Sequence, residues 1–99
     1  MAETIEEITL NYEEDGQLIV KELDKEVLTK GAWSTIMFRY QNWDRKTEAF
    51  GDDLFTIRRY RKVKGSYLPQ SKFNISSREQ AGRIIDILQK WTQEEKGEI

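Results

Sequence analysis

The side chains best suited to chemistry in this chain are basic and lie close together. The segment TIRRYRKVKG, residues 56–65, holds five of the sixteen basic residues within the seven positions from Arg58 to Lys64. Guanidinium and ammonium groups gathered in this way bind phosphates and release the counterions that surround a nucleic acid. Tyr60 stands within the run, and aromatic rings stack on unpaired bases. The segment therefore indicates binding to phosphates and bases.

Catalytic chemistry has few residues to work with. The chain contains no cysteine and no histidine, so it lacks a thiol nucleophile and the commonest general base and metal ligand. The acidic groups Asp52-Asp53 and Glu13-Glu14-Asp15 lack the spacing of a calcium loop, and no glycine-rich phosphate loop is present. We therefore predict that the protein is not an enzyme and has no catalytic residue, no metal site and no cofactor.

Charge is distributed unevenly along the 99 residues. Residues 1–28 carry a net charge of −7, residues 29–50 carry +2, residues 51–75 carry +4 and residues 76–99 carry −1, which leaves −2 for the whole chain. Asymmetry of this kind indicates a charged partner more strongly than the total charge does.

The order of the patterns predicts a single α+β domain over residues 1–99, since a chain of this length forms one hydrophobic core. Residues 1–30 are expected to form acidic N-terminal strands or an extension, with ITLNYEE and QLIVKEL as the strand segments. Residues 31–75 are expected to form the core of the sheet, and residues 76–93 a C-terminal helix. A chain this short would gain stability by oligomerising.

Two long strands position the basic residues. GAWSTIMFRYQNW and LFTIRRYRKV are rich in β-branched and aromatic residues, and tight turns are expected at Asp15-Gly16 and Lys64-Gly65. Because alternate residues of a strand face opposite sides, Arg58, Tyr60 and Lys62 are expected to share one face. The sequence does not say which face of the sheet packs against the helix.

The clearest helix is the segment SSREQAGRIIDILQKWTQ. Ser76 and Glu79 have the spacing of a capping box. Apolar residues recur at helical spacing on a face that is expected to lean on the sheet: Ala81, Ile84, Ile85, Leu88 and Trp91.

The stretch from Trp33 to Trp91 resembles the transcriptional coactivator family known as positive cofactor four, which has single-stranded-DNA-binding relatives in bacteria and phages. That family has an aliphatic-x-aliphatic-Arg-x-aromatic strand, a hairpin, a lysine and an Ile-Ser element leading into a helix. FTIRRYRK and SKFNISSREQ follow this order, and the matching positions are Ile57, Arg58, Tyr60, Lys72, Ile75, Ser76, Glu79 and Gln80. The likeness covers about 60 of the 99 residues.

The resemblance implies a curved antiparallel sheet of four to five strands with one C-terminal helix, paired into a homodimer that binds single-stranded DNA largely without sequence preference. The family's binding positions correspond to Arg58, Arg61 and Lys72, with Arg61 standing where relatives often have a stacking aromatic. Phe73 stands where the family usually has glycine, and the loop from Asn42 to Asp53 is longer than the family pattern.

We therefore predict single-stranded DNA as the partner, with RNA as an alternative, in transcription or DNA maintenance. The protein is expected in the cytoplasm, including at the nucleoid, with no membrane segment. The predicted binding residues, joined by one of the tryptophans, are Arg58, Arg61, Lys62, Lys72, Tyr60, Arg39 and Tyr40. Two other interpretations stay open: an edge strand charged against aggregation, and a protein-interaction module that uses an exposed strand edge or the basic patch.

Overall fold

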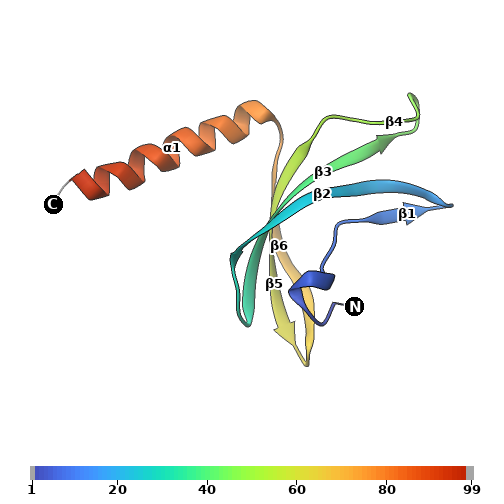
Figure 1. Cartoon of the computed structure of the whole chain (residues 1–99), viewed down its shortest axis with the longest axis horizontal. Coiled ribbons are helices and arrows are strands. Elements are labelled where there is room, and N and C mark those ends of the chain that lie inside the picture. The colour runs from blue at the N-terminus through green and yellow to red at the C-terminus, as the bar shows by residue number, and fades with distance from the viewer. Residues whose placement is uncertain (1, 98–99) are drawn as a thin grey trace.

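The computed structural model describes residues 2–97 and shows an α+β fold, with one curled antiparallel sheet and one C-terminal helix (Figure 1). This confirms the predicted fold class. The strand order is β1-β2-β3-β5-β6, and β4 pairs with β3 outside this path. In chain order the elements are η1 (Ile5–Glu7, a 3₁₀ turn), β1 (Tyr12–Glu14), β2 (Gln17–Thr29), β3 (Trp33–Asp44), β4 (Ala49–Phe50), β5 (Leu54–Val63), β6 (Ser66–Ile75) and α1 (Arg78–Gly97).

Two tight turns form where the sequence predicts them. Asp15 and Gly16 connect β1 to β2 with φ angles of 50° and 80°, and Lys64 and Gly65 connect β5 to β6 with 51° and 85°. Two successive positive φ angles suit the right-handed twist of a hairpin, and glycine adopts such an angle without steric cost. The first predicted strand, ITLNYEE, is mostly wrong, because within it only Tyr12–Glu14 forms a strand.

The strand register divides the side chains between two faces of the sheet. Directly paired residues share a face, and β3 pairs with β5 through Ser34↔Tyr60, Ile36↔Arg58 and Phe38↔Thr56. We call this the inner face, and it also carries Lys72, the β6 partner of Arg58. The opposite side, the outer face, carries the alternate residues of the same strands, including Trp33, Met37, Ile57, Arg59 and Arg61.

The inner face is covered by the N-terminal segment, residues 2–11, rather than by a helix. Three of its apolar side chains, Ile5, Ile8 and Leu10, join one buried cluster with residues of the sheet. Burying apolar surface in this way is the main stabilising term of a small domain. The sheet contributes Ile36, Phe38 and Tyr60 to the cluster.

Two charged side chains of β2 hold this segment in place. The Nζ of Lys25 donates hydrogen bonds to the carbonyl oxygens of Ile5, Glu6 and Ile8, at 2.9, 3.2 and 2.6 Å. The Oε1 of Glu22 accepts hydrogen bonds from the Thr9 hydroxyl at 2.9 Å and from the Leu10 backbone N–H at 3.1 Å. These bonds satisfy polar groups of a segment that is not paired as a strand.

The helix does not lean on the sheet over its length, which corrects the expectation from its apolar face. The main contact of α1 is with β6, and the rest of the helix extends away from the sheet (Figure 1). Ala81 and Ile84 are half-buried, whereas Ile85, Leu88 and Trp91 are 61%, 53% and 58% exposed. The N-terminal segment already covers the inner face, so the helix is not needed there.

The helix cap lies one residue beyond the predicted one. The Gln80 backbone N–H donates to the Ser77 hydroxyl at 3.0 Å, and the Gln80 side-chain oxygen accepts from the Ser76 backbone N–H at 2.6 Å. Ser77 therefore caps the helix in place of Ser76. Gln80 takes the place of Glu79, but it accepts from the Ser76 backbone N–H rather than from that of the cap residue. Within residues 2–97 no helix is long and apolar enough to cross a membrane, and no group of three or more acidic residues could hold a metal ion.

Candidate nucleic-acid interface

Two of the predicted binding residues, Arg58 and Lys72, are brought together directly. They are cross-strand partners in the pairing of β5 with β6. Like charges placed directly opposite each other destabilise a sheet. Neither side chain forms an ion pair with any residue in the described part of the chain. The pair is therefore well placed to hold an anion.

A pocket of about 330 Å³ lies beside this pair, and none of its lining residues is acidic. Its lining consists of Arg58, Pro69, Gln70, Ser71 and Lys72. The β5–β6 register shifts between Arg59 and Tyr60, which leaves Gln70 outside the pairing. A bulge of this kind bends the edge strand and re-aims its side chains. Arg58 and Lys72 therefore line a pocket in which no carboxylate competes for their charge.

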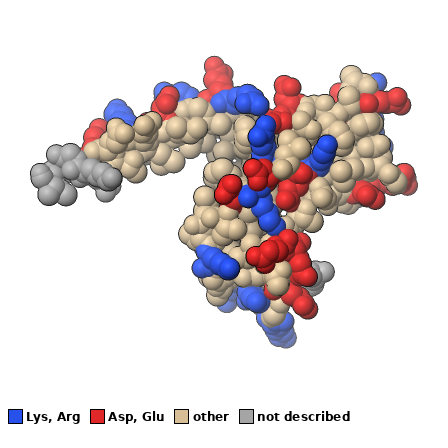
Figure 2. All heavy atoms as spheres, in the orientation of Figure 1, with Lys and Arg blue, Asp and Glu red and all other residues tan. Residues whose placement is uncertain are grey.

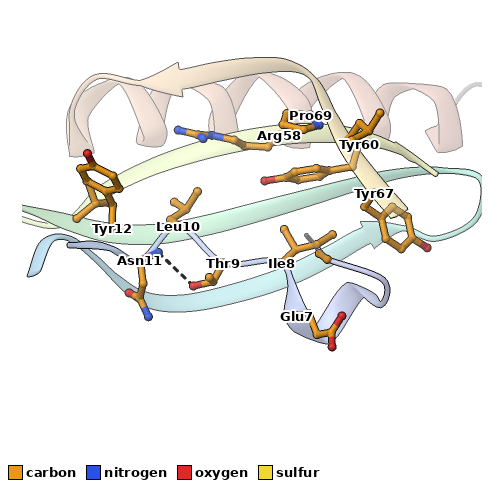
Figure 3. A pocket seen from close by; sticks show the side chains of 13 residues that line it. Glu7, Ile8, Thr9, Leu10, Asn11, Tyr12, Arg58, Tyr60, Tyr67 and Pro69 are labelled. Atoms are coloured by element: carbon orange, nitrogen blue, oxygen red, sulfur yellow. Dashed lines mark hydrogen bonds between the residues drawn. The ribbon is translucent and has the colours of Figure 1, made fainter. Parts of the chain in front are cut away.

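A larger groove of about 870 Å³ shares Arg58 and Pro69 with this pocket (Figure 3). It lies between the N-terminal segment and the β5–β6 hairpin, with Arg58 and Pro69 along one side and Ile8 and Leu10 along the other. Most of its lining residues are apolar or aromatic; Arg58 is the one basic residue of the lining and Glu7 the one acidic residue. An unpaired base next to a bound phosphate would meet surface of this kind.

Tyr60 is not available for stacking on a base. Its side chain is 6% exposed and packs in the buried cluster beneath the N-terminal segment. Burial raises the pKa of its hydroxyl, an effect that the nearby charge of Arg58 opposes. The predicted stacking role of Tyr60 does not fit this arrangement, because a segment distant in sequence covers the ring.

Arg39 and Tyr40 lie away from the Arg58–Lys72 pair. Arg39 is on the outer face, where its Nε donates a hydrogen bond to Asp53 at 2.6 Å and the two form an ion pair. Hydrogen bonds from Arg39 and Gln41 lower the pKa of the Asp53 carboxyl. Arg39 is thus already paired with a carboxylate, and Tyr40 is half-buried against the inner cluster.

The remaining basic residues among the predicted binding residues are divided between the two faces of the sheet. Lys62 lies on the inner side, with its Nζ 5.3 Å from the centre of the Tyr67 ring. Arg61 lies on the outer face, 5.5 Å from the centre of the Trp33 ring, and Arg59 lies 4.6 Å from the same ring. Arg59 was not among the predicted binding residues. The alternation in RRYR, which puts it on the same face as Arg61, is the signal that could have identified it.

Two adjacent segments at one end of the sheet contain no acidic residue. Residues 27–35 and 58–70 together hold six basic residues and no acidic residue. They lie side by side, because β3 pairs with β5 and the Lys62 backbone N–H donates to the Ala32 carbonyl at 2.7 Å. Figure 2 shows blue basic side chains at this lower end of the molecule, with red acidic side chains close by. The predicted concentration of positive charge therefore exists in space as well as in sequence.

No protein-family model, no curated protein and no solved structure matches this chain. The likeness to the positive cofactor four family thus depends on residues 33–91 of the sequence alone.

Proposed function

We propose that this chain binds single-stranded nucleic acid and that Arg58 and Lys72 hold its phosphates. The observation that carries the proposal is that two basic side chains, Arg58 and Lys72, lie directly opposite each other beside a pocket with no acidic lining residue. A phosphate between them would relieve their repulsion and accept charge-assisted hydrogen bonds from both. Because phosphate contacts carry no base information, binding is expected to be largely independent of sequence.

The groove beside the pair favours a single strand over a duplex. Its apolar and aromatic lining, which includes Leu10, Tyr67 and Pro69, suits the flat surfaces of unpaired bases. In a duplex these surfaces are stacked inside the helix and only base edges and phosphates are presented. The lining does not by itself distinguish DNA from RNA, so single-stranded DNA is the first ligand to test and RNA the second.

The test compares binding to a labelled oligo-dT of about 20 nucleotides with binding to a duplex of equal length, at two salt concentrations. Replacing Arg58 and Lys72 together by alanine should weaken binding to the single strand. It should also make the log–log salt slope shallower by about 0.7 for each phosphate that the variant no longer neutralises.

The matched control is Arg83→Ala with Lys90→Ala, which removes the same two charges from exposed positions of α1. Equal affinities and slopes for the two double variants would contradict the role of Arg58 and Lys72. If the unaltered chain bound neither oligonucleotide at low salt, the proposed function itself would be wrong.

A second proposed property, self-association, is favoured by α1. Ile85, Leu88 and Trp91 are large, apolar and more than half exposed, and they recur every three residues along the helix. Contiguous exposed apolar surface marks interaction sites, and a helix that packs on the sheet over only part of its length gains little stability from tertiary contacts. We propose a homodimer in which this apolar helix face is buried against a second copy. The helix face supports protein interaction better than a strand edge or the basic patch does.

A further inference from the structure

We infer that Trp33, Arg59 and Arg61 form a second nucleic-acid contact, a platform on the outer face on which an unpaired base stacks. We call these three residues the outer platform. They lie on the side of the sheet opposite to the Arg58–Lys72 pair. The inference rests on the proposed nucleic-acid function, but it assigns a different surface that can be measured separately.

The platform is held in place by contacts within the chain. Trp33 of β3 is the direct cross-strand partner of Arg61, and Arg59 lies two residues away on the same face of β5. The guanidinium carbons of Arg59 and Arg61 are 4.6 and 5.5 Å from the centre of the indole ring. Cation–π contacts at these distances favour this orientation of the ring. Trp33 nevertheless remains 43% exposed, so part of the ring surface is accessible to a ligand.

The two arginines retain the capacity to bind phosphate. Neither forms an ion pair with any of the residues whose side chains the structure describes, 2–94. Contact with an aromatic ring does not consume the five N–H donors of a guanidinium group. A nucleotide could therefore place its base on the indole and its phosphate on an arginine.

Trp43 has a different environment in the same sheet. It lies at the opposite end of β3 and packs edge-on against Phe50, with ring centres 5.1 Å apart. Its neighbour in sequence is an acid, Asp44, and Phe50 is its partner in β4. Trp33 instead lies in residues 27–35, which together with the adjacent residues 58–70 hold six basic residues and no acidic residue. Its ring contacts two guanidinium groups rather than another aromatic ring, and this environment suits an anionic ligand.

A flexible strand can reach both contacts by passing around β6. Arg58 and Arg59 are consecutive residues that face opposite sides, and their β6 partners are Lys72 and Ser71. β6 lies at the end of the strand order, and none of the described strands pairs with its outer edge. A single strand can bend around such an edge, whereas a duplex resists sharp bending. The two contacts together therefore also predict a preference for single strands.

The experiment uses the full chain with Trp43→Phe and Trp91→Phe, so that Trp33 is the one remaining tryptophan. It is titrated with oligo-dT while tryptophan fluorescence and the anisotropy of a labelled oligonucleotide are recorded in parallel. Stacking should quench the fluorescence in step with the rise in anisotropy. In the otherwise unaltered chain, Trp33→Ala should lower affinity roughly 5- to 150-fold, the range that base–aromatic stacking gives. Trp43→Ala serves as the matched control and should leave affinity unchanged.

Arg59→Ala with Arg61→Ala keeps the indole and should also weaken binding, with a shallower salt slope. Circular dichroism and thermal melting establish that each variant is folded. Binding without quenching, together with unchanged affinity of Trp33→Ala, would overturn the platform and leave the proposed function standing. Absence of any binding by the unaltered chain at low salt would overturn both.

Discussion

At the scale of single residues, the basic side chains differ in whether a carboxylate already pairs with them. Arg39 is held by Asp53, and Arg45 pairs with Glu14. Arg58, by contrast, lies opposite another basic residue, Lys72, and has no acidic partner in the described part of the chain. A basic side chain that already pairs with a carboxylate has less to gain from a phosphate. Basic side chains without an acidic partner are therefore the better candidates for binding.

The network around Asp53 predicts a pH dependence of stability. Hydrogen bonds from Arg39 and Gln41 lower the pKa of Asp53 in the folded protein below its value in the unfolded chain, which is about 3.9. A carboxyl of this kind stabilises the fold above its unfolded pKa, and that contribution is lost as pH falls through the folded pKa. We expect Asp53→Asn to lower the free energy of unfolding near neutral pH. The deficit should vanish as the pH falls well below about 4.

Urea denaturation of both proteins across this acidic range measures the effect. Asp52→Asn is the control, because it removes the same charge from a neighbouring exposed side chain. A deficit of constant size from neutral to acidic pH would show that the charge of Asp53 is not what stabilises the fold.

At the scale of elements, the N-terminal segment, rather than the helix as expected, packs against the sheet and covers its inner face. Ile5, Ile8 and Leu10 are spaced by three and then by two residues, because a 3₁₀ turn is followed by extended chain. This spacing matches neither the helical nor the strand period. The segment is also rich in acids, so its core role is hard to recognise in the sequence.

The anchoring of this segment gives a prediction about Lys25. Lys25→Met removes a charged group that donates to the carbonyls of Ile5, Glu6 and Ile8. Hydrogen bonds to charged groups contribute about 1.5–3 kcal/mol each at most, so we expect a loss of about 2 kcal/mol in the free energy of unfolding. Urea denaturation measures it, with Lys46→Met, an exposed lysine of the β3–β4 turn, as control. Equal stability of the two variants would refute the anchoring role.

At the scale of the whole molecule, the chain is thin and extended. Its principal dimensions are 57 × 40 × 17 Å, and α1 extends away from the sheet (Figure 1). One apolar face of α1 therefore has no counterpart over most of its length within residues 2–97. A second copy would bury that face and would also double the number of nucleic-acid contacts on one particle.

Self-association is tested by light scattering coupled to size-exclusion chromatography. The unaltered chain should have twice the chain mass, and Leu88→Glu should shift it to a monomer, because a buried, unpaired carboxylate is costly. Gln89→Glu adds the same charge to the next, exposed position of the helix and should leave the dimer intact. A single chain mass for the unaltered protein at every concentration would rule out the homodimer.

Local chemistry was sufficient to identify several elements of this fold. The turns at Asp15-Gly16 and Lys64-Gly65 and the full extent of β5 follow from residue types over a few positions. The helix was also identifiable, although two adjacent serines, Ser76 and Ser77, left its cap uncertain by one residue. These features depend on backbone sterics and short-range hydrogen bonds, which nearby residues determine.

The candidate site depended on contacts between segments that are distant in sequence. Strand alternation placed Arg58, Tyr60 and Lys62 on one face, but it did not show that residues 2–11 bury Tyr60 there. The pairing of Arg58 with Lys72 required the β5–β6 register, and the contact of Arg59 with Trp33 required β3 beside β5. The two-residue period of a strand indicates which side chains share a face. Only the folded chain determines which face is covered and which basic side chains lie next to each other.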